Sequence, residues 1–307
     1  MISTKRIRIG TRESALALYQ ANEVKSKLSQ IGIESEIIEI TSDGDIDLVT
    51  PLYEMGIQGI FTKSLDIALL QNRVDLAIHS CKDIPTKLAE GLSLCAVLER
   101  ASPFDCIVLP KGKATVDFSK DCVIATSSMR RKSQWMYRYP NHATENLRGN
   151  IQTRLKKLDG SNWSGAIFAQ AALERLAISS HQWITLDWML PAPAQGAIAI
   201  VCREGDDSIE ETLASINHKH TKLCISVERD FLAALQGGCA VPIAAYALIQ
   251  HDQLLFKGNI FSLGAREKCE VEISFDINRA SEAGNLAARK ILQQGAEKIV
   301  KTFRPSF

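Results

Sequence analysis

The stretch RIRIGTRESALALYQANEVKSKL, residues 6–28, decides the fold. Ile7 and Ile9 alternate with polar side chains, a pattern typical of a β-strand. Ser14 can cap a helix, and the apolar residues after it recur at helical spacing: Ala17, Ala21, Val24 and Leu28. A strand that leads directly into an amphipathic helix is the repeating unit of α/β proteins.

The same alternation continues over the first two-thirds of the chain and favours parallel α/β layers. Further strands are expected at 36–41, 74–79, 122–126, 143–147 and 165–169, with helices at 62–72, 130–139 and 151–158. A strand at 196–202 follows Leu190-Pro191-Ala192-Pro193 and has no partner nearby in the sequence. We therefore expect the chain to build a second sheet and then return to the first.

From about Lys219 the pattern changes. A helix at 221–235 precedes three strand-like runs at 241–249, 253–261 and 268–275, and a long helix at 281–302 follows. Strands grouped between two helices predict a small α+β domain. We predict three domains: a discontinuous α/β domain of residues 1–100 with 194–216, a second α/β domain of residues 104–191, and a C-terminal α+β domain of residues 219–307.

Composition excludes several classes of protein. The chain has 307 residues, 46% of them hydrophobic and 23% charged, which is typical of a globular protein. Its formal net charge of +1 provides no global field for nucleic acid or an anionic membrane. The N-terminus has no apolar signal-peptide core, and no apolar run reaches transmembrane length, so we expect a soluble, cytoplasmic protein.

Eight cysteines are scattered without a Cys-x-x-Cys pair. Most are expected to be reduced, half-buried and inert, and clustered zinc ligands are absent. His218 and His220 lie two residues apart, which suits a solvated helix start better than a metal site. Cys239 differs because Gly237-Gly238 precedes it at a helix end, where a turn can present the sulfur.

Positive charge gathers between residues 130 and 157. Eight Lys and Arg against Glu145 give 8 − 1 = +7 in a chain of net charge +1. Lys156 and Lys157 fit a solvated helix face. Arg130 and Arg131 follow a strand-to-helix junction, where backbone N–H groups favour anions. Other arginines follow similar junctions, and a site for carboxylates or phosphates is expected from Arg12, Arg130, Arg131, Arg148 and Arg154.

Asp83 follows a buried-type strand and precedes Pro85. It can be a turn carboxylate paired with Lys82. It can equally be a functional carboxylate at the carboxyl end of a strand, which is the ligand edge of open α/β sheets. Residue spacing alone leaves both interpretations open.

Five motifs together resemble the porphobilinogen deaminase family, in its order and spacing over about residues 6–246. They are Ile9-Gly10-Thr11-Arg12-Glu13-Ser14-Ala15-Leu16-Ala17, His79-Ser80-Cys81-Lys82-Asp83-Ile84-Pro85, Thr126-Ser127-Ser128-Met129-Arg130-Arg131, Leu147-Arg148-Gly149-Asn150 with Thr153-Arg154-Leu155, and Gly237-Gly238-Cys239-Ala240-Val241-Pro242-Ile243. The resemblance implies two periplasmic-binding-protein-like α/β domains around a cleft, with a third domain that carries the cofactor loop.

The resemblance also implies the chemistry. Four porphobilinogen molecules condense head to tail with loss of ammonia, on a dipyrromethane primer joined by a thioether to Cys239. Asp83 is implied as the catalytic carboxylate. The implied cofactor-binding residues are Lys82, Asp83, Thr126, Ser128, Arg130, Arg131 and Arg154, and the implied substrate-binding residues are Arg12, Ser14, Arg148 and Arg154. No metal is implied.

The chain departs from the family pattern at four positions. Glu54 and Gln58 stand where many bacterial members have lysines. Phe104 stands where arginine is common, and Ala194 where glycine is common. The departures concern the loop over the cleft rather than the aspartate, the cysteine or the main arginines.

The residues alone leave three other functions open. A non-catalytic two-domain protein that binds a polycarboxylate or another small anion would use the same fold, although it needs neither Cys239 nor Asp83. Nucleic-acid binding through residues 130–157 lacks a recognised motif. A thiol hydrolase lacks a paired histidine. We expect a monomer that binds porphobilinogen, and neither nucleic acid nor membrane.

Overall fold

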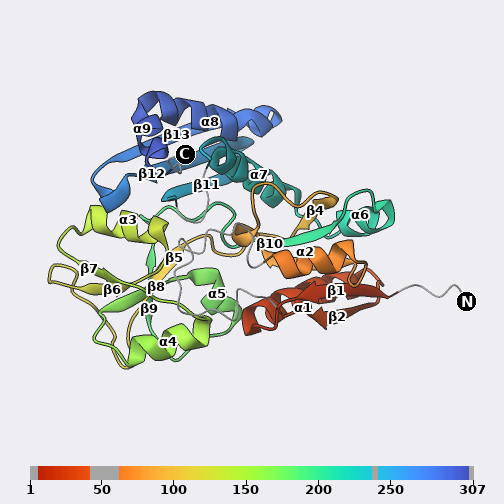
Figure 1. Ribbon diagram of the computed structural model, residues 1–307, viewed down its shortest axis with the longest axis horizontal. Helices are drawn as coiled ribbons and strands as arrows, with labels where there is room; N and C mark the ends of the chain where they lie inside the picture. Colours follow the sequence, from red (N-terminus) through yellow and green to blue (C-terminus); the bar gives the residue numbers. More distant parts are fainter. Residues whose placement is uncertain (1–5, 42–61, 237–240, 304–307) are drawn as a thin grey trace, which may run out of the picture. The chain divides into compact units, whose positions relative to one another are not determined.

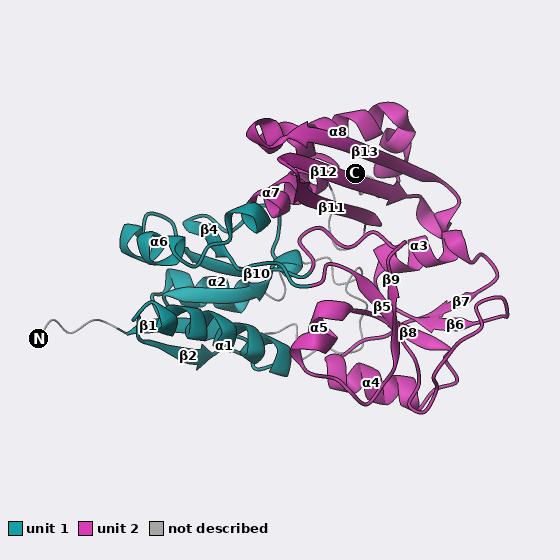
Figure 2. Ribbon diagram, turned by 180° about the vertical axis from the view of Figure 1, so that it is seen from behind, with its two compact units in different colours: residues 1–48, 57–101, 196–222 teal, residues 49–56, 102–195, 223–307 magenta. Residues whose placement is uncertain are grey.

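The computed structural model describes residues 6–41, 62–236 and 241–303. These residues form two compact units, coloured separately in Figure 2. Unit 1 contains the described residues of 6–101 together with 196–222, and unit 2 contains 102–195 and 223–303. No helix in the described ranges is long and apolar enough to cross a membrane.

Unit 1 is built on a five-stranded sheet of order β2-β1-β3-β10-β4 (Figure 1). Its strands are β1 (Ile7–Thr11), β2 (Ser35–Glu39), β3 (Leu76–Ser80), β4 (Leu92–Val97) and β10 (Ile198–Arg203). Its helices are α1 (Ala15–Gln30), α2 (Lys63–Leu70) and α6 (Asp207–Ala214). The apolar stripe of α1 packs on the sheet, and both Ala21 and Val24 are completely buried.

The late strand returns to the first sheet, as the sequence predicts. β10 lies between β3 and β4 and pairs antiparallel with both. Ile198 lies opposite Ser80, and Ala199 opposite both His79 and Val97. β1, β2 and β3 are parallel to one another. The sheet is therefore mixed, and its parallel part is the N-terminal part of the chain.

Unit 2 contains a second five-stranded sheet, of order β7-β6-β8-β5-β9. Its strands are β5 (Asp105–Val108), β6 (Val123–Ala125), β7 (Ala143–Glu145), β8 (Gly165–Ala169) and β9 (Trp183–Leu186). Its helices are α3 (Met129–Arg138), α4 (Ile151–Asp159) and α5 (Gln170–Arg175). β6, β7 and β8 are parallel, whereas β5 pairs antiparallel with β8 and β9.

The C-terminal part carries an antiparallel sheet of order β11-β12-β13. Its elements are α7 (Lys219–Ala234), β11 (Ile243–Gln250), β12 (Gln253–Phe261), β13 (Lys268–Asp276), α8 (Ala283–Ile291) and α9 (Glu297–Lys301). Phe231 of α7 packs on Phe256 of β12, with ring centroids 5.0 Å apart. The predicted α/β class with a small C-terminal α+β part is confirmed, while the predicted domain boundaries stay a prediction.

The single long helix predicted for residues 281–302 is wrong. A π-type turn at Leu292–Ala296 separates α8 from α9. Gly295 has φ +109°, a conformation that side chains other than glycine rarely adopt, so the helix breaks there.

Candidate active site

The carboxyl ends of β1 and β3 form one edge of the unit 1 sheet, because these strands are parallel neighbours with Gly10 opposite Ala77. Arg12 and Ser14 follow β1, and Lys82 and Asp83 lie in a short 3₁₀ turn after β3. We call these four residues the unit 1 edge. Four of the predicted site residues therefore follow adjacent strands of one sheet, where open α/β sheets bind ligands.

Asp83 is exposed. It makes no hydrogen bond or ion pair with any residue in the described ranges, so the pairing with Lys82 that its position allows is not present there. An exposed carboxylate without a partner of its own in the described ranges is available to a ligand.

Ser14 has a structural partner. Its hydroxyl accepts a hydrogen bond from the backbone N–H of Ala17 at 3.3 Å and so caps α1. Gln20, one turn further along, donates from Nε2 to the hydroxyl of Ser80 at 2.9 Å. The start of α1 is therefore tied to the end of β3, which fixes the strand end that precedes Asp83.

His79 is a residue of the same region that the sequence analysis did not single out. It is 5% exposed, and its Nε2 has no hydrogen-bond partner among the described residues. Burial, and secondarily the positive charge of Arg12, lower the pKa of His79 to about 4. The imidazole is therefore neutral at pH 7. Its place in a buried-type strand is visible in the sequence, but the lack of a hydrogen-bond partner for its Nε2 among the described residues is not.

The corresponding edge of unit 2 holds the other predicted residues: Thr126, Ser128, Arg130, Arg131, Arg148 and Arg154, which we call the unit 2 edge. Thr126 is buried, and its hydroxyl accepts from the backbone N–H of Ser128 at 3.3 Å. Ser128 caps α3 by accepting from the N–H of Arg131 at 3.4 Å. Ser127 binds the N–H of Leu147 at 2.8 Å and joins the loops after β6 and β7.

Arg130 and Arg131 are buried and share one carboxylate, that of Asp105 at the start of β5. Arg130 donates from Nη1 to Asp105 Oδ2 at 2.7 Å and to the Leu190 carbonyl at 2.8 Å. Arg131 donates to Asp105 Oδ1 from Nη2 at 2.7 Å and from Nε at 3.1 Å. Its Nη1 donates to the Ile167 carbonyl at 2.9 Å. Asp105 had no predicted role, and it organises both predicted arginines.

The cluster of Arg130, Arg131 and Asp105 carries a net positive charge. Burial on its own raises the pKa of Asp105, but the two guanidinium groups outweigh it and hold the pKa far below its usual range. Asp105 is therefore ionised, and the cluster has two positive charges and one negative charge, 2 − 1 = +1. A buried excess of one positive charge favours an anionic ligand nearby.

Arg148 and Arg154 lie in the next loop and helix. Arg148 is buried, and Arg154 donates from Nε to the Gly149 carbonyl at 2.7 Å, which holds the turn between them. Lys156 and Lys157 are exposed, as predicted for a solvated face. The ammonium of Lys157 also donates to the Arg148 carbonyl at 3.1 Å, a local contact that the spacing did not suggest.

Buried polar groups hold the connection at residues 190–195. The Ala194 N–H donates to Glu228 Oε2 at 2.6 Å, and the Ala247 N–H donates to Glu228 Oε1 at 2.7 Å. Gln195 donates to Asp105 Oδ1 at 2.9 Å. Glu228 was not predicted as a functional residue, because it lies within an ordinary amphipathic helix pattern in α7. The only indication of its role in the sequence is that a carboxylate occupies the apolar face of this helix.

Two of the four positions at which the chain departs from the family pattern lie within the described residues. Ala194 has φ +64°, the left-handed conformation that favours glycine. Phe104 packs against Tyr246, with ring centroids 6.2 Å apart. Glu54 and Gln58 lie outside the described residues, as does Cys239.

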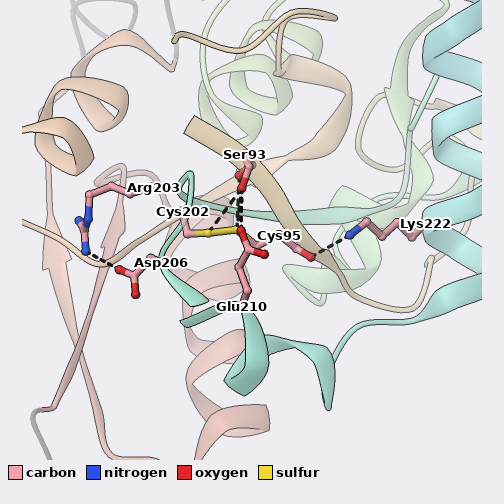
Figure 3. The surroundings of a disulfide bond; sticks show 7 residues. All are labelled: Ser93, Cys95, Cys202, Arg203, Asp206, Glu210 and Lys222. Carbon is pink, nitrogen blue, oxygen red and sulfur yellow. Dashed lines mark hydrogen bonds and ion pairs between the residues drawn. A yellow bond between two sulfur atoms is a disulfide. The ribbon is translucent and has the colours of Figure 1, made fainter. Parts of the chain in front are cut away.

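The expected chemistry of the cysteines is confirmed in part and corrected in part. Cys81, Cys106, Cys122 and Cys224 are buried free thiols, and burial raises the pKa of Cys106 to about 12. Cys95 and Cys202, however, form a disulfide (Figure 3). The Glu210 carboxylate lies beside them, with one donor atom of each of the three residues within 4.8 Å of the others. This pairing was not predicted, because Cys95 and Cys202 are far apart in the sequence.

The geometry defines an α/β protein in which cationic side chains and an exposed aspartate follow the carboxyl ends of parallel strands. The model of the porphobilinogen deaminase dipyrromethane cofactor binding domain matches residues 7–211, and that of the porphobilinogen deaminase C-terminal domain matches residues 222–293. The chain belongs to the porphobilinogen deaminase family.

Curated relatives agree with this assignment. Porphobilinogen deaminases of Legionella pneumophila, strains Paris and Lens, are each 38% identical over 306 residues, covering 98% of this chain and 99% of the relative. Among solved structures, the periplasmic VFT2 domain of Bordetella pertussis BvgS superposes with a TM-score of 0.42 at 12% identity, covering 69% of this chain and 87% of its own.

Proposed function

We propose that this chain is a transferase of tetrapyrrole synthesis that condenses four porphobilinogen molecules head to tail, with loss of ammonia, into hydroxymethylbilane. The observation that carries the proposal is the family match over both parts of the chain, residues 7–211 and 222–293. The alternative of a non-catalytic anion-binding protein is not favoured, because family models and curated relatives alike name a deaminase.

Dipyrromethane is the cofactor, as the description of the matching family model states. The donor set fits a group that carries several carboxylates, because the unit 2 edge combines the hydroxyls of Thr126 and Ser128 with four arginines and a buried excess of positive charge. We assign its binding to Lys82, Asp83, Thr126, Ser128, Arg130, Arg131 and Arg154, with the thioether at Cys239. When bound, the cofactor supplies the pyrrole carbon to which the first substrate ring is joined.

Asp83 is the proposed catalytic carboxylate. A pyrrole N–H becomes more acidic, and its ring more positive, as ammonia leaves the neighbouring carbon. A carboxylate that accepts this N–H stabilises the developing charge, and preorganised electrostatic groups of this kind are usually the largest contribution in enzyme sites. The exposed carboxylate of Asp83 is not neutralised by a described side chain, which supports this role.

Arg12, Ser14, Arg148 and Arg154 are proposed to hold the acetate and propionate groups of the substrate. Guanidinium groups bind carboxylates in a bidentate geometry that lysine lacks. Ser14 accepts an N–H as a helix cap, and its hydroxyl hydrogen can still be donated to a carboxylate.

Intact-mass spectrometry tests the assignment most directly. The purified chain is expected to exceed its sequence mass by two linked pyrrole units, and the Cys239→Ser variant is expected to lack that mass. With porphobilinogen, the loaded chain should add further pyrrole units and release a tetrapyrrole. An active chain of unmodified mass contradicts the cofactor assignment.

A matched pair of variants tests the arginines. Removing one hydrogen bond to a charged group costs about 1.5–3 kcal/mol, so Arg148→Gln or Arg154→Gln should slow pyrrole addition roughly 10- to 100-fold. Lys156→Gln removes the same charge two residues from Arg154 in α4, but its side chain is exposed, and we expect less than a 2-fold effect. Equal loss in the arginine and lysine variants would rule out the division between site and surface.

We further propose a cytoplasmic monomer that binds neither nucleic acid nor membrane. The net charge of +1 supports the absence of a polyanionic partner. Light scattering of the purified chain tests the monomer, and an electrophoretic shift with duplex DNA tests the nucleic-acid statement.

A further inference from the structure

The bond between Cys95 and Cys202 joins two neighbouring strands of the unit 1 sheet (Figure 3). In the β4–β10 pair, Val201 lies opposite Leu94 and Ile200 lies opposite Ala96, so Cys95 is an extra residue in β4. Such a bulge redirects side chains. It places Cys95 on the face of the sheet that carries Cys202, where both sulfurs meet α6. The two Cα atoms are 6.2 Å apart, within the usual disulfide range.

The two sulfurs differ in exposure. Cys202 is completely buried among the apolar side chains of the unit 1 core. Cys95 is partly exposed at the margin of the same cluster. A thiol from solution can therefore approach the bond from the Cys95 side, whereas Cys202 is shielded.

Polar groups surround the accessible side. The Ser93 hydroxyl lies 3.2 Å from Cys95 Sγ and 3.7 Å from Cys202 Sγ, and 3.5 Å from a carboxylate oxygen of Glu210 (Figure 3). Lys222 donates to the Cys95 carbonyl at 2.9 Å and holds this part of β4 in place. A hydroxyl within reach of both sulfurs can donate to whichever sulfur is released, which a purely apolar setting could not do.

We propose that Cys95 and Cys202 form a reversible redox site that exchanges with low-molecular-weight thiols, with Cys95 the attacked sulfur and Cys202 the leaving one. A glutathione thiolate forms a bond to Cys95 Sγ while the bond to Cys202 Sγ breaks, and the Cys202 thiolate takes up the proton that glutathione lost. A second glutathione thiolate attacks the glutathione sulfur of this mixed disulfide and releases Cys95 as a thiol. Two electrons pass to the protein, and one glutathione disulfide forms.

The position of the bond in the chain gives it a measurable effect. The two cysteines are 107 residues apart, and the enclosed loop contains the whole of residues 102–195. Closing a long loop restricts the unfolded chain and stabilises the folded state. Reduction should lower the thermal midpoint by roughly 5–10 °C. Cys122→Ala, which removes a buried free thiol elsewhere, should leave this difference between oxidised and reduced protein unchanged.

Glutathione buffers of graded potential test the site on the full-length purified chain. The linked Cys95–Cys202 peptide, quantified by mass spectrometry after alkylation, should disappear in a single two-electron transition, with a tenfold change in the disulfide-to-dithiol ratio for every ~30 mV. A linked peptide that survives all buffers until the chain is unfolded would overturn the proposal.

Trapping variants test the predicted asymmetry. Oxidised glutathione should form a mixed disulfide at Cys95 in Cys202→Ala. In Cys95→Ala it should modify Cys202 at least tenfold more slowly, because Cys202 is buried. Cys95→Ser and Cys202→Ser provide a second pair should either alanine variant fold poorly. Equal modification of the two cysteines would overturn the assignment of the attacked sulfur.

Discussion

The unit 1 edge and the unit 2 edge carry charge in opposite ways. In unit 1, Asp83 is exposed and without a polar partner in the described ranges. In unit 2, Arg130 and Arg131 are buried against Asp105, and their guanidinium groups also donate to backbone carbonyls. Both edges follow the carboxyl ends of parallel strands. The negative charge of the unit 1 edge is thus exposed, whereas the negative charge beside the unit 2 edge is buried and engaged by two arginines.

The comparison predicts different consequences for the loss of one negative charge at each edge. The unit 2 carboxylate should matter mainly for folding, and the unit 1 carboxylate mainly for the reaction.

Asp105→Asn should have the largest effect, on stability. It leaves two buried guanidinium groups without their carboxylate, and breaking a buried ion pair in this way costs about 3–5 kcal/mol. Urea denaturation measures the change in the free energy of unfolding. Glu272→Gln is the control, because it removes a surface ion pair with Lys257 and should cost less than about 1 kcal/mol. Equal costs for both variants would break the comparison.

Asp83→Asn should act on the reaction instead. Removing a preorganised charge typically costs 10²–10³-fold in rate, roughly 2.7–4 kcal/mol of barrier, and excess substrate should not restore it. Because Asp83 is exposed, the free energy of unfolding should change by less than about 0.5 kcal/mol. Single-turnover pyrrole addition is measured after mass spectrometry confirms that the cofactor is present. Asp83→Glu should keep part of the activity, and a near-normal rate in Asp83→Asn would make Asp83 a turn residue only.

Regular periodicity made much of the fold predictable from the sequence. β8 and β12 begin and end at the predicted residues, and β10 returns to the first sheet as its lack of a local partner implied. β4, β5 and β9 were missed because each is followed by another strand rather than by a helix, so none belongs to the strand-to-helix pattern used for the prediction. The break at Gly295 was missed because a lone glycine is tolerated in many helices.

The candidate site was predictable only where motifs mark strand ends. Arg12, Asp83 and Arg148 could be placed from the sequence because each follows a strand. Asp105 and Glu228 could not, because their roles come from burial against partners that lie distant in the sequence. The pairing of Cys95 with Cys202 could not be placed either, because it depends on a bulge in β4 and on the register of β10 beside it, and residue spacing reveals neither.

His79 provides the pH test of unit 1. Its pKa in the folded protein is about 4, below the ordinary value of 6.5, so between these values the unfolded chain binds more protons. Stability from His79 is therefore complete above pH 6.5 and is lost as the pH falls to about 4, by roughly 3 kcal/mol. His79→Gln should flatten this part of the stability curve, and His220→Gln, a substitution at an exposed position, serves as its control. Parallel curves for the wild type and His79→Gln would show that His79 does not titrate in this window.

Ala194 gives the smallest effect and tests how firmly unit 2 holds its connecting segment. The N–H of Ala194 donates to buried Glu228, and its φ of +64° is a conformation that costs an alanine about 1–2 kcal/mol. Substitution by glycine removes this cost. Glycine also has more conformational freedom in the unfolded chain, however, which lowers the free energy of unfolding by about 0.4–1 kcal/mol. Ala194→Gly should therefore raise the free energy of unfolding by about 0.5–1 kcal/mol, as measured in urea. Ala199→Gly, a buried strand position in β10 without a positive φ, should instead lower it by about 0.5–1 kcal/mol. A loss of stability in both variants would mean that the positive φ costs Ala194 less than the freedom that glycine adds to the unfolded chain.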